Sequence, residues 1–240
     1  MNWWAALYDE HVADMFLDAP VEDETRFLWN HLGLDPGSRV LDQCCGTGRL
    51  SLALARQGAS VLGIDQAPAY IERARHGANG LAAQFEVADA FFYVPDERFN
   101  AVFNWWTSFG YEAHDDANFR MLDRARDALH PGGSFALDVP NAPGLFRHFE
   151  PATVLRRDGT VLLRESRLDL VGGSLHKTWN WFLSDGRQMR HETRVRLYLP
   201  HELHTALAAR GFLDIHFYGS VAGDALTLDS PRCIVVARRG

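Results

Sequence analysis

The sequence predicts an α/β fold: a mostly parallel sheet with helices on both faces and an antiparallel β insertion. Strand-like and helix-like segments alternate from position 39 to position 139, which is typical of βαβ units in a parallel sheet. Three consecutive strand-like segments then follow over 160–198 without a helix between them. The length of 240 residues and the apolar fraction of 47% are sufficient for a full core in one domain.

The N-terminal 33 residues are expected to form a helical lid within a single domain of residues 1–240. Apolar side chains recur at helical spacing over 2–18, and 22–32 forms a second amphipathic helix that ends at Gly33. The first helix either packs on the core or closes over a ligand crevice with Tyr8 facing inward.

A glycine loop between two strands organises the next part of the chain. The first strand stops at Asp42, and Gly46 and Gly48 lack a β-carbon, so the backbone can turn sharply and approach a ligand closely. Asp65 lies at the carboxyl end of the following strand. Such a unit binds a nucleotide-like ligand in the crevice beyond the strand ends.

The remaining segments complete the sheet and its insertion. We interpret 141–199 as the insertion, because Gly172-Gly173 and Asp185-Gly186 are hairpin signals between its strands. The expected strands are 84–87, 99–104, 134–139, 160–170, 174–184, 188–198, 212–218 and 233–238, and the expected helices are 68–76, 116–129 and 201–210.

Composition excludes several classes of protein. A formal net charge of −7 argues against a nucleic-acid partner, because binding to a phosphate backbone needs a basic face. No apolar run reaches the roughly 20 residues that span a bilayer, and the acidic N-terminus does not resemble a signal or transit peptide. Three cysteines, two of them adjacent, do not form a disulfide framework. We therefore expect a cytoplasmic protein with no membrane partner, either a monomer or a homodimer.

Residues 40–48, Val-Leu-Asp-Gln-Cys-Cys-Gly-Thr-Gly, resemble the first motif of class I S-adenosylmethionine-dependent methyltransferases, which commonly read V-L-D-x-G-C-G-T-G. The resemblance continues with Asp65, with Asp89 after the third strand, and with the Pro-Gly-Gly turn at 131–133. In one departure, Cys44 replaces the first glycine. A positive φ angle would be strained there, so we expect an ordinary conformation at Cys44 or a slightly displaced loop.

The resemblance implies a seven-stranded Rossmann-like sheet whose last strand is antiparallel. It also implies S-adenosyl-L-methionine as methyl donor, with S-adenosyl-L-homocysteine as product. Asp65 would accept hydrogen bonds from the ribose, and Asp89 would accept one from the adenine amino group. The positions that match the family's cofactor site are Asp42, Cys44, Gly46, Gly48, Asp65, Gln66, Asp89, Ala90, Asn104 and Trp105.

The acceptor side is predicted from aromatic and polar residues that follow strand ends or lie in the N-terminal segment and the insertion. They indicate a slot for a small, flat or heteroaromatic molecule and are Trp3, Tyr8, Trp106, Phe109, Tyr111, Asn141 and Trp179. No catalytic dyad and no metal-ligand spacing is visible, and His11 and His191 are the candidates for a base. An N-methyl acceptor is preferred over an O-methyl acceptor, because an amine can react without a base.

Three alternatives remain open at this point. Gly46-x-Gly48-x-x-Ser51 is an imperfect dinucleotide-binding fingerprint, which would indicate a dehydrogenase. The substituted Cys44 and the missing base would also suit a non-catalytic S-adenosylmethionine-binding protein. A protein methyltransferase is the third alternative.

Overall fold

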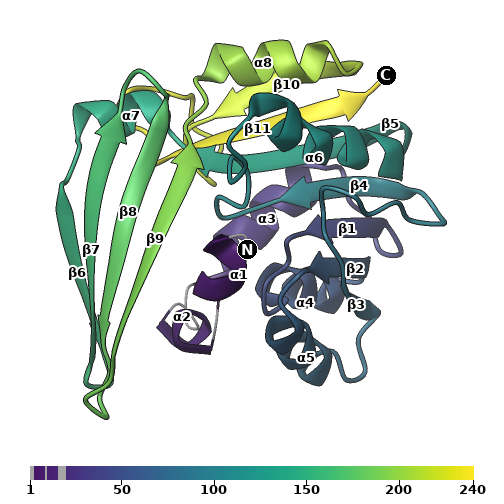
Figure 1. The fold of residues 1–240 in the computed structure, drawn as a ribbon. Coiled ribbons are helices and arrows are strands. Elements are labelled where there is room, and N and C mark those ends of the chain that lie inside the picture. Colours follow the sequence, from purple (N-terminus) through teal and green to yellow (C-terminus); the bar gives the residue numbers. More distant parts are fainter. Residues whose placement is uncertain (1–2, 9, 16–19) are drawn as a thin grey trace.

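The computed structural model describes residues 3–8, 10–15 and 20–240, and its centre is a seven-stranded sheet (Figure 1). The strand order is β10-β11-β5-β4-β1-β2-β3, and β11 runs antiparallel to both of its neighbours. The predicted Rossmann-like sheet with one antiparallel strand is therefore confirmed. Its strands are β1 (Arg39–Gln43), β2 (Ser60–Asp65), β3 (Ala83–Val87), β4 (Phe99–Asn104), β5 (Leu129–Pro140), β10 (Phe212–Tyr218) and β11 (Arg232–Arg239).

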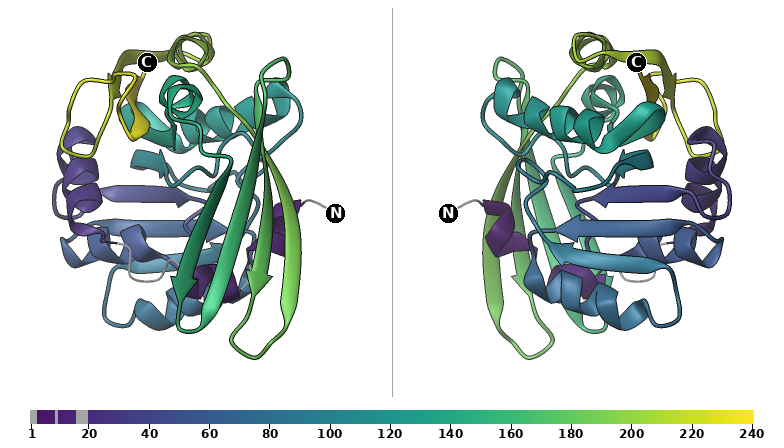
Figure 2. Two further views of the ribbon diagram at one scale, coloured as in Figure 1. Left: turned by 90° about the vertical axis from the view of Figure 1, so that its left-hand side faces the viewer. Right: turned by 90° about the vertical axis from the view of Figure 1, so that its right-hand side faces the viewer.

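Helices cover both faces of this sheet (Figure 2). Strand alternation sends Val40 of β1 to the face packed against α3 and α4, and Leu41 to the face packed against α6 and α8. Both side chains are almost fully buried. The helices of the main sheet are α3 (Glu22–His31), α4 (Arg49–Arg56), α5 (Pro68–Gly77), α6 (Asp115–Ala128) and α8 (Pro200–Ala208).

A second, antiparallel sheet stands beside the carboxyl ends of the parallel strands (Figures 1 and 2). It comprises β6 (Ala152–Arg157), β7 (Thr160–Asp169), β8 (Ser174–Phe182) and β9 (Gln188–Arg196). Its inner face turns toward the main sheet: Trp181 is 1% exposed, whereas its neighbour Phe182 is 41% exposed. This sheet is the antiparallel insertion of the predicted fold class.

The structure differs from the sequence expectations in three segments. The helix expected over 2–18 is two short helices, α1 (Trp3–Leu7) and α2 (Glu10–Met15), and residues 2, 9 and 16–18 lie outside the described residues. The insertion contains α7 (Ala142–Arg147) and strand β6, which were not expected. The turn at 131–133 belongs to β5, where Gly132 adopts φ 76° and the pairing with β4 shifts register. Among the described residues, no helix is long and apolar enough to cross a membrane.

Candidate active site

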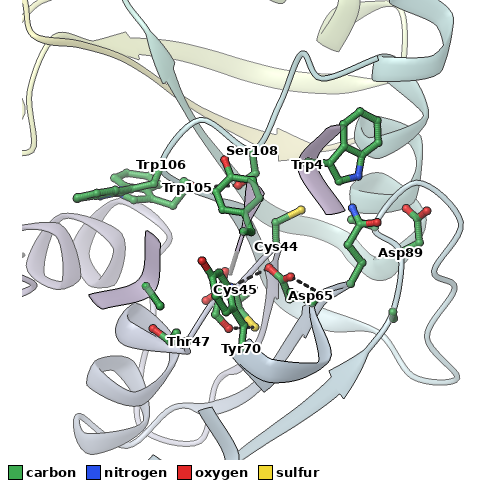
Figure 3. A pocket seen from close by; sticks show the side chains of 18 of the residues that line it. Trp4, Cys44, Cys45, Thr47, Asp65, Tyr70, Asp89, Trp105, Trp106 and Ser108 are labelled. Carbon is green, nitrogen blue, oxygen red and sulfur yellow. Dashed lines mark hydrogen bonds between the residues drawn. The ribbon is translucent and has the colours of Figure 1, made fainter. Parts of the chain in front are cut away.

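A cavity of about 380 Å³ lies beyond the carboxyl ends of β1, β2 and β4 (Figure 3). It lies where a doubly wound sheet binds its ligands, and its volume is in the range of small-molecule sites. Many of the residues predicted from the sequence line it together, and these are Tyr8, Asp42, Cys44, Gly46, Asp65, Gln66, Asp89, Ala90, Trp105, Trp106 and Tyr111.

The Asp65 carboxylate is held by the glycine loop. The backbone N–H of Gly46 donates to Oδ2 at 3.0 Å and the N–H of Ala67 donates to Oδ1 at 2.9 Å (Figure 3). Burial raises the pKa of Asp65 above its ordinary value, and these two hydrogen bonds oppose the shift. Each oxygen keeps further acceptor capacity, and the residue lines the cavity. A ligand carrying two hydroxyl groups can therefore donate to it.

Two further carboxyl groups lie in the cavity wall. Asp42 is 3% exposed and accepts a 2.6 Å hydrogen bond from the Ser51 hydroxyl, and burial raises its pKa to about 8. Asp89 accepts a hydrogen bond from the N–H of Phe91 at 2.9 Å through Oδ1. That contact orients the carboxyl group of Asp89 in the cavity wall.

The conformation of Cys44 differs from the sequence expectation. Its φ is 62°, so the residue is left-handed although it carries a side chain, at a cost of about 1–2 kcal/mol. Hydrogen bonds hold the loop in place: the N–H of Cys45 donates to the Ile64 carbonyl at 2.9 Å, and the N–H of Gly48 donates to the Cys45 carbonyl at 3.0 Å. Burial holds the pKa of the Cys44 thiol well above its usual value, so the group stays protonated at neutral pH.

The cavity is suited to a nucleoside-like ligand. A β-carbon added at Gly46 would meet only Tyr70 within 4 Å, so the backbone of the loop borders open space. The Trp4 side chain places a buried Nε1 donor at the cavity, and this donor has no partner among the described residues. Figure 3 shows the Trp4 nitrogen on the side of the cavity that carries Asp65 and Asp89. Acceptors for ribose and amino groups and an unused donor therefore face the same space.

A second cavity, of about 570 Å³, separates the strand ends from the inner face of the antiparallel sheet. Of the predicted acceptor residues, Trp3, Asn141 and Trp179 line it. It shares wall residues with the first cavity, namely Tyr8, Val12, Trp106 and Tyr111. The two cavities therefore adjoin each other at these four side chains.

Two tyrosines hydrogen-bond to each other at this junction. The hydroxyls of Tyr8 and Tyr111 are in contact, and their rings stack with centroids 6.3 Å apart. Burial raises the pKa of Tyr8 to about 12 and that of Tyr111 well above its usual value. Both phenols therefore remain protonated at neutral pH, and the junction offers neutral oxygens rather than a charged base.

The loop after β4 is strained and clamped. Trp106 and Thr107 have φ angles of 60° and 64°, which L-residues rarely adopt. Asp138 of β5, 2% exposed, accepts a hydrogen bond from the N–H of Trp106 at 3.0 Å. Arg232 donates to the same carboxylate through Nε, at 2.6 Å, and through Nη2, and it also donates to the Thr107 hydroxyl at 3.2 Å. This ion pair fixes the loop that borders both cavities.

Five predicted site residues lie outside both cavities. Asn104 is fully buried and donates to the Gln43 carbonyl at 3.2 Å. Phe109 packs on Tyr198 in the core. The remaining three are Gly48, where a β-carbon would lie 2.8 Å from the Phe85 ring, His11 and His191. In the described part of the chain, no three His, Cys, Asp or Glu side chains are grouped so that they could hold a metal ion.

Several residues at the site were not predicted from the sequence. The sequence does mark Asp138 as unusual, because it is an acidic residue inside the apolar strand Phe-Ala-Leu-Asp-Val. Nothing in the sequence distinguishes Arg232 from the other arginines. Lys177 and Arg164, which line the second cavity, were interpreted only as strand residues.

Comparison with known sequences relates the central part of the chain to methyltransferases. Residues 40–133 match the family model of a methyltransferase domain. An uncharacterised methyltransferase of Synechocystis sp. is 44% identical over 131 residues, covering 52% of this chain and 57% of that protein. A 23S rRNA (uracil(1939)-C(5))-methyltransferase of Shewanella amazonensis is 46% identical over 144 residues, covering 59% of this chain and 29% of that protein. The chain thus spans less than two thirds of either relative.

Solved structures share the fold over nearly the whole chain. The CcbJ methyltransferase of Streptomyces caelestis has a TM-score of 0.82 at 20% identity and covers 97% of this chain and 98% of its own. CalS10, an amino pentose methyltransferase of Micromonospora echinaspora solved with bound S-adenosylmethionine, has a TM-score of 0.73 at 22% identity, with 96% of each chain covered. KedS8, a sugar N-methyltransferase of Streptoalloteichus sp., has a TM-score of 0.76 at 20% identity and covers 96% of this chain and 92% of its own.

At these identities the structural likeness establishes the fold and leaves the substrate open. The sequence match and the fold agree, because the matched residues form the glycine loop and the strand ends around the first cavity. Residues 40–133 thus match a methyltransferase domain, and the whole chain has the fold of solved S-adenosylmethionine-dependent methyltransferases.

Proposed function

We propose that this protein transfers a methyl group from S-adenosylmethionine to a small acceptor, with a nitrogen acceptor preferred over oxygen. The observation that carries the proposal is the pair of adjoining cavities, one bordered by the glycine loop and the other by the antiparallel sheet. A donor in the first and an acceptor in the second would meet at the junction lined by Tyr8, Trp106 and Tyr111.

The residues of the first cavity hold and orient the donor in this proposal. Asp65, fixed by two backbone N–H groups, accepts hydrogen bonds from the ribose hydroxyls, and Asp89 accepts one from the adenine amino group. Asp42 and Cys44 border the end nearest the glycine loop. When bound, S-adenosylmethionine supplies a methyl group that its sulfonium already activates.

The protein's remaining contribution is position and exclusion of water. The clamped loop at 105–107 and the two phenols set the width of the junction. A phenol oxygen there accepts an N–H of a neutral amine and directs the nitrogen lone pair along the line of transfer. An amine that is already neutral needs no residue to remove a proton before attack. The candidates His11 and His191 lie outside both cavity walls, and His148, which lines the second cavity, contacts Asp229 at 2.8 Å.

The N-terminal helices act as a lid in this proposal, as the sequence led us to expect. Trp4, Tyr8 and Val12 contribute to the first cavity, and Trp3, Leu7, Tyr8 and Val12 contribute to the second. Opening α1 and α2 would therefore admit both ligands, and closing them would keep water from the junction. The cytoplasmic location and the monomeric or dimeric state stay predictions.

An RNA acceptor is the alternative that the relatives raise. The similarity to the rRNA methyltransferase covers 29% of that protein. A net charge of −7 does not favour a phosphate backbone, although it leaves local basic patches possible. Small-molecule acceptors are supported by the volume of the second cavity and by fold neighbours named as an amino pentose methyltransferase and a sugar N-methyltransferase.

Calorimetry with S-adenosylmethionine and S-adenosylhomocysteine tests the donor site. We expect both compounds to bind. Asp65→Ala should weaken binding about 10- to 100-fold, because the ligand loses a charged hydrogen-bond partner. Asp169→Ala is the matched control, because Asp169 also accepts a backbone N–H but lies in a hairpin of the antiparallel sheet. Failure of the wild-type protein to bind either compound, or unchanged affinity in Asp65→Ala, would contradict the proposal.

A paired acceptor screen tests the preference for nitrogen. Glucosamine and glucose differ in one amine, and release of S-adenosylhomocysteine measures turnover. Methylation of hydroxyl compounds alone across such pairs would contradict the preference while leaving the donor site intact.

A further inference from the structure

The second cavity contains the only lysine of the chain. Arginine provides 23 of the 24 basic residues, and Lys177 is the exception. Lys177 lies on β8, is half-buried and lines the cavity wall. The ammonium group of a lysine is a compact charge with three donors, whereas the guanidinium of an arginine is a planar fork.

A second cation, Arg164, lies on the same face of the antiparallel sheet. Arg164 of β7 pairs with Trp179 in register, and Trp179 lies two residues from Lys177 on β8, so all three side chains point to the inner face. The Arg164 guanidinium carbon is 5.4 Å from the centroid of the Trp179 ring. Its Nε donates to the Thr153 hydroxyl at 3.2 Å.

The carboxylates in and next to this cavity wall are already paired elsewhere. Asp229, which lines the cavity, contacts His148 at 2.8 Å and Arg147 at 3.3 Å, and Asp138, which is not a wall residue, binds the wall residue Arg232. Glu165 and Glu192, on the strands that carry and flank the two cations, alternate to the outer face. Across residues 3–8, 10–15 and 20–240, no carboxylate lies within ion-pair distance of Lys177 or Arg164.

Two half-buried cations without a counter-ion are costly. Burial, with a smaller contribution from Arg164, lowers the pKa of Lys177 to about 8. Burial also lowers the pKa of Arg164. An anion in the cavity would compensate both charges, and the Trp179 ring would provide an apolar wall beside it.

We propose that Lys177 and Arg164 bind an anionic group, a carboxylate or a phosphate, of the methyl acceptor. The inference rests on the proposed function, because it assigns the second cavity to the acceptor. It narrows the acceptor to an amine that also carries an oxyanion, with the amine at the junction lined by Tyr8 and Tyr111 and the oxyanion at the two cations in the same cavity. The two cations then fix the end of the acceptor that does not react.

Because Lys177 is the only lysine, protein labelled with carbon-13 at lysine Cε gives a single side-chain signal whose pH titration reports this one group. The probes are two matched pairs, glucosamine 6-phosphate with glucosamine and tyrosine with tyramine. One pair tests a phosphate and the other a carboxylate. We expect the anionic member of one pair to shift the signal and to raise the Lys177 pKa, because an adjacent negative charge favours the ammonium form.

Affinities of variants complete the test. In calorimetry with the same probes, Lys177→Gln and Arg164→Gln should each weaken binding of the probe that carries the oxyanion about 10-fold or more, or about 1.4 kcal/mol, and should leave binding of its partner without the oxyanion unaffected. Arg167→Gln is the control, because Arg167 lies on the outer face of the same strand, β7. The affinity of the wild-type protein for the probe with the oxyanion should fall as the pH rises through about 8, where Lys177 loses its charge.

The outcomes separate this inference from the proposed function. S-adenosylhomocysteine binding measures the donor site and should be the same in all three variants. If neither probe with an oxyanion shifts the Lys177 signal, or if these probes bind no more tightly than their partners without the oxyanion, the inference is wrong even where the donor binds. If the donor does not bind, the proposed function fails whatever the probes do.

Discussion

The clamp between Asp138 and Arg232 offers a quantitative test of how the active-site loop is held. Asp138→Asn removes the charge that accepts two hydrogen bonds from Arg232 and one from the backbone N–H of Trp106. Breaking a buried ion pair from one side costs about 3–5 kcal/mol. The Arg232 side chain is 33% exposed and its stranded charge is partly hydrated, so we expect a loss of about 2–3 kcal/mol in the free energy of unfolding.

Urea denaturation followed by tryptophan fluorescence and circular dichroism measures this loss. For a domain of this size the melting temperature should fall by about 5–10 °C. Glu97→Gln is the control: Glu97 pairs with Arg39 but is 69% exposed, so its loss should cost under about 1 kcal/mol. Arg232→Met added to Asp138→Asn should cost less than the sum of the single changes, because no charge is then left unpaired. A single Asp138→Asn variant within about 0.5 kcal/mol of the wild type would refute the reasoning.

Three further predictions concern the first cavity. Cys44→Gly should be about 1 kcal/mol more stable than Cys44→Ala in urea, because glycine relieves the left-handed strain, and equal stabilities would contradict this. Burial raises the pKa of Asp42 to about 8 in the folded state, so the contribution of the protonated carboxyl group to stability is present below about pH 4 and is lost as the pH rises to 8. The free energy of unfolding of the wild type relative to that of Asp42→Asn should therefore fall over this pH range. A constant difference between the two proteins would count against the prediction. Trp4→Phe removes the Nε1 donor, which has no partner in the described part of the chain, and should weaken S-adenosylhomocysteine about 3- to 10-fold in calorimetry. Unchanged affinity would show that this donor is not used.

The main sheet could be predicted because its signals are local. Apolar runs, glycine turns and helical spacing placed its strands and helices within a few residues of their positions in the structure. Strand β6 was missed because it is an edge strand whose burial alternates weakly and which ends in Arg156 and Arg157. Helix α7 was missed because it is six residues long and contains both Pro143 and Gly144.

The conformation of the glycine loop shows the limit of a sequence pattern. At Cys44 the pattern suggested that a side chain would exclude a positive φ angle. The structure keeps the positive angle, because the hydrogen bonds from Cys45 and Gly48 and the packing of the loop outweigh a strain of about 1–2 kcal/mol. Local preference was overridden by tertiary contacts there.

The sequence by itself determined the resemblance to methyltransferases and the positions expected around the first cavity, because most of these positions follow the ends of consecutive strands between Asp42 and Trp106. Only the tertiary structure decided which distant residues meet at the junction and in the second cavity. Asp138 and Arg232 are 94 residues apart, and Tyr8 and Tyr111 are 103 apart. Lys177 and Arg164 meet through the register of two antiparallel strands. Such contacts depend on how distant elements pack, which no periodicity in the chain records.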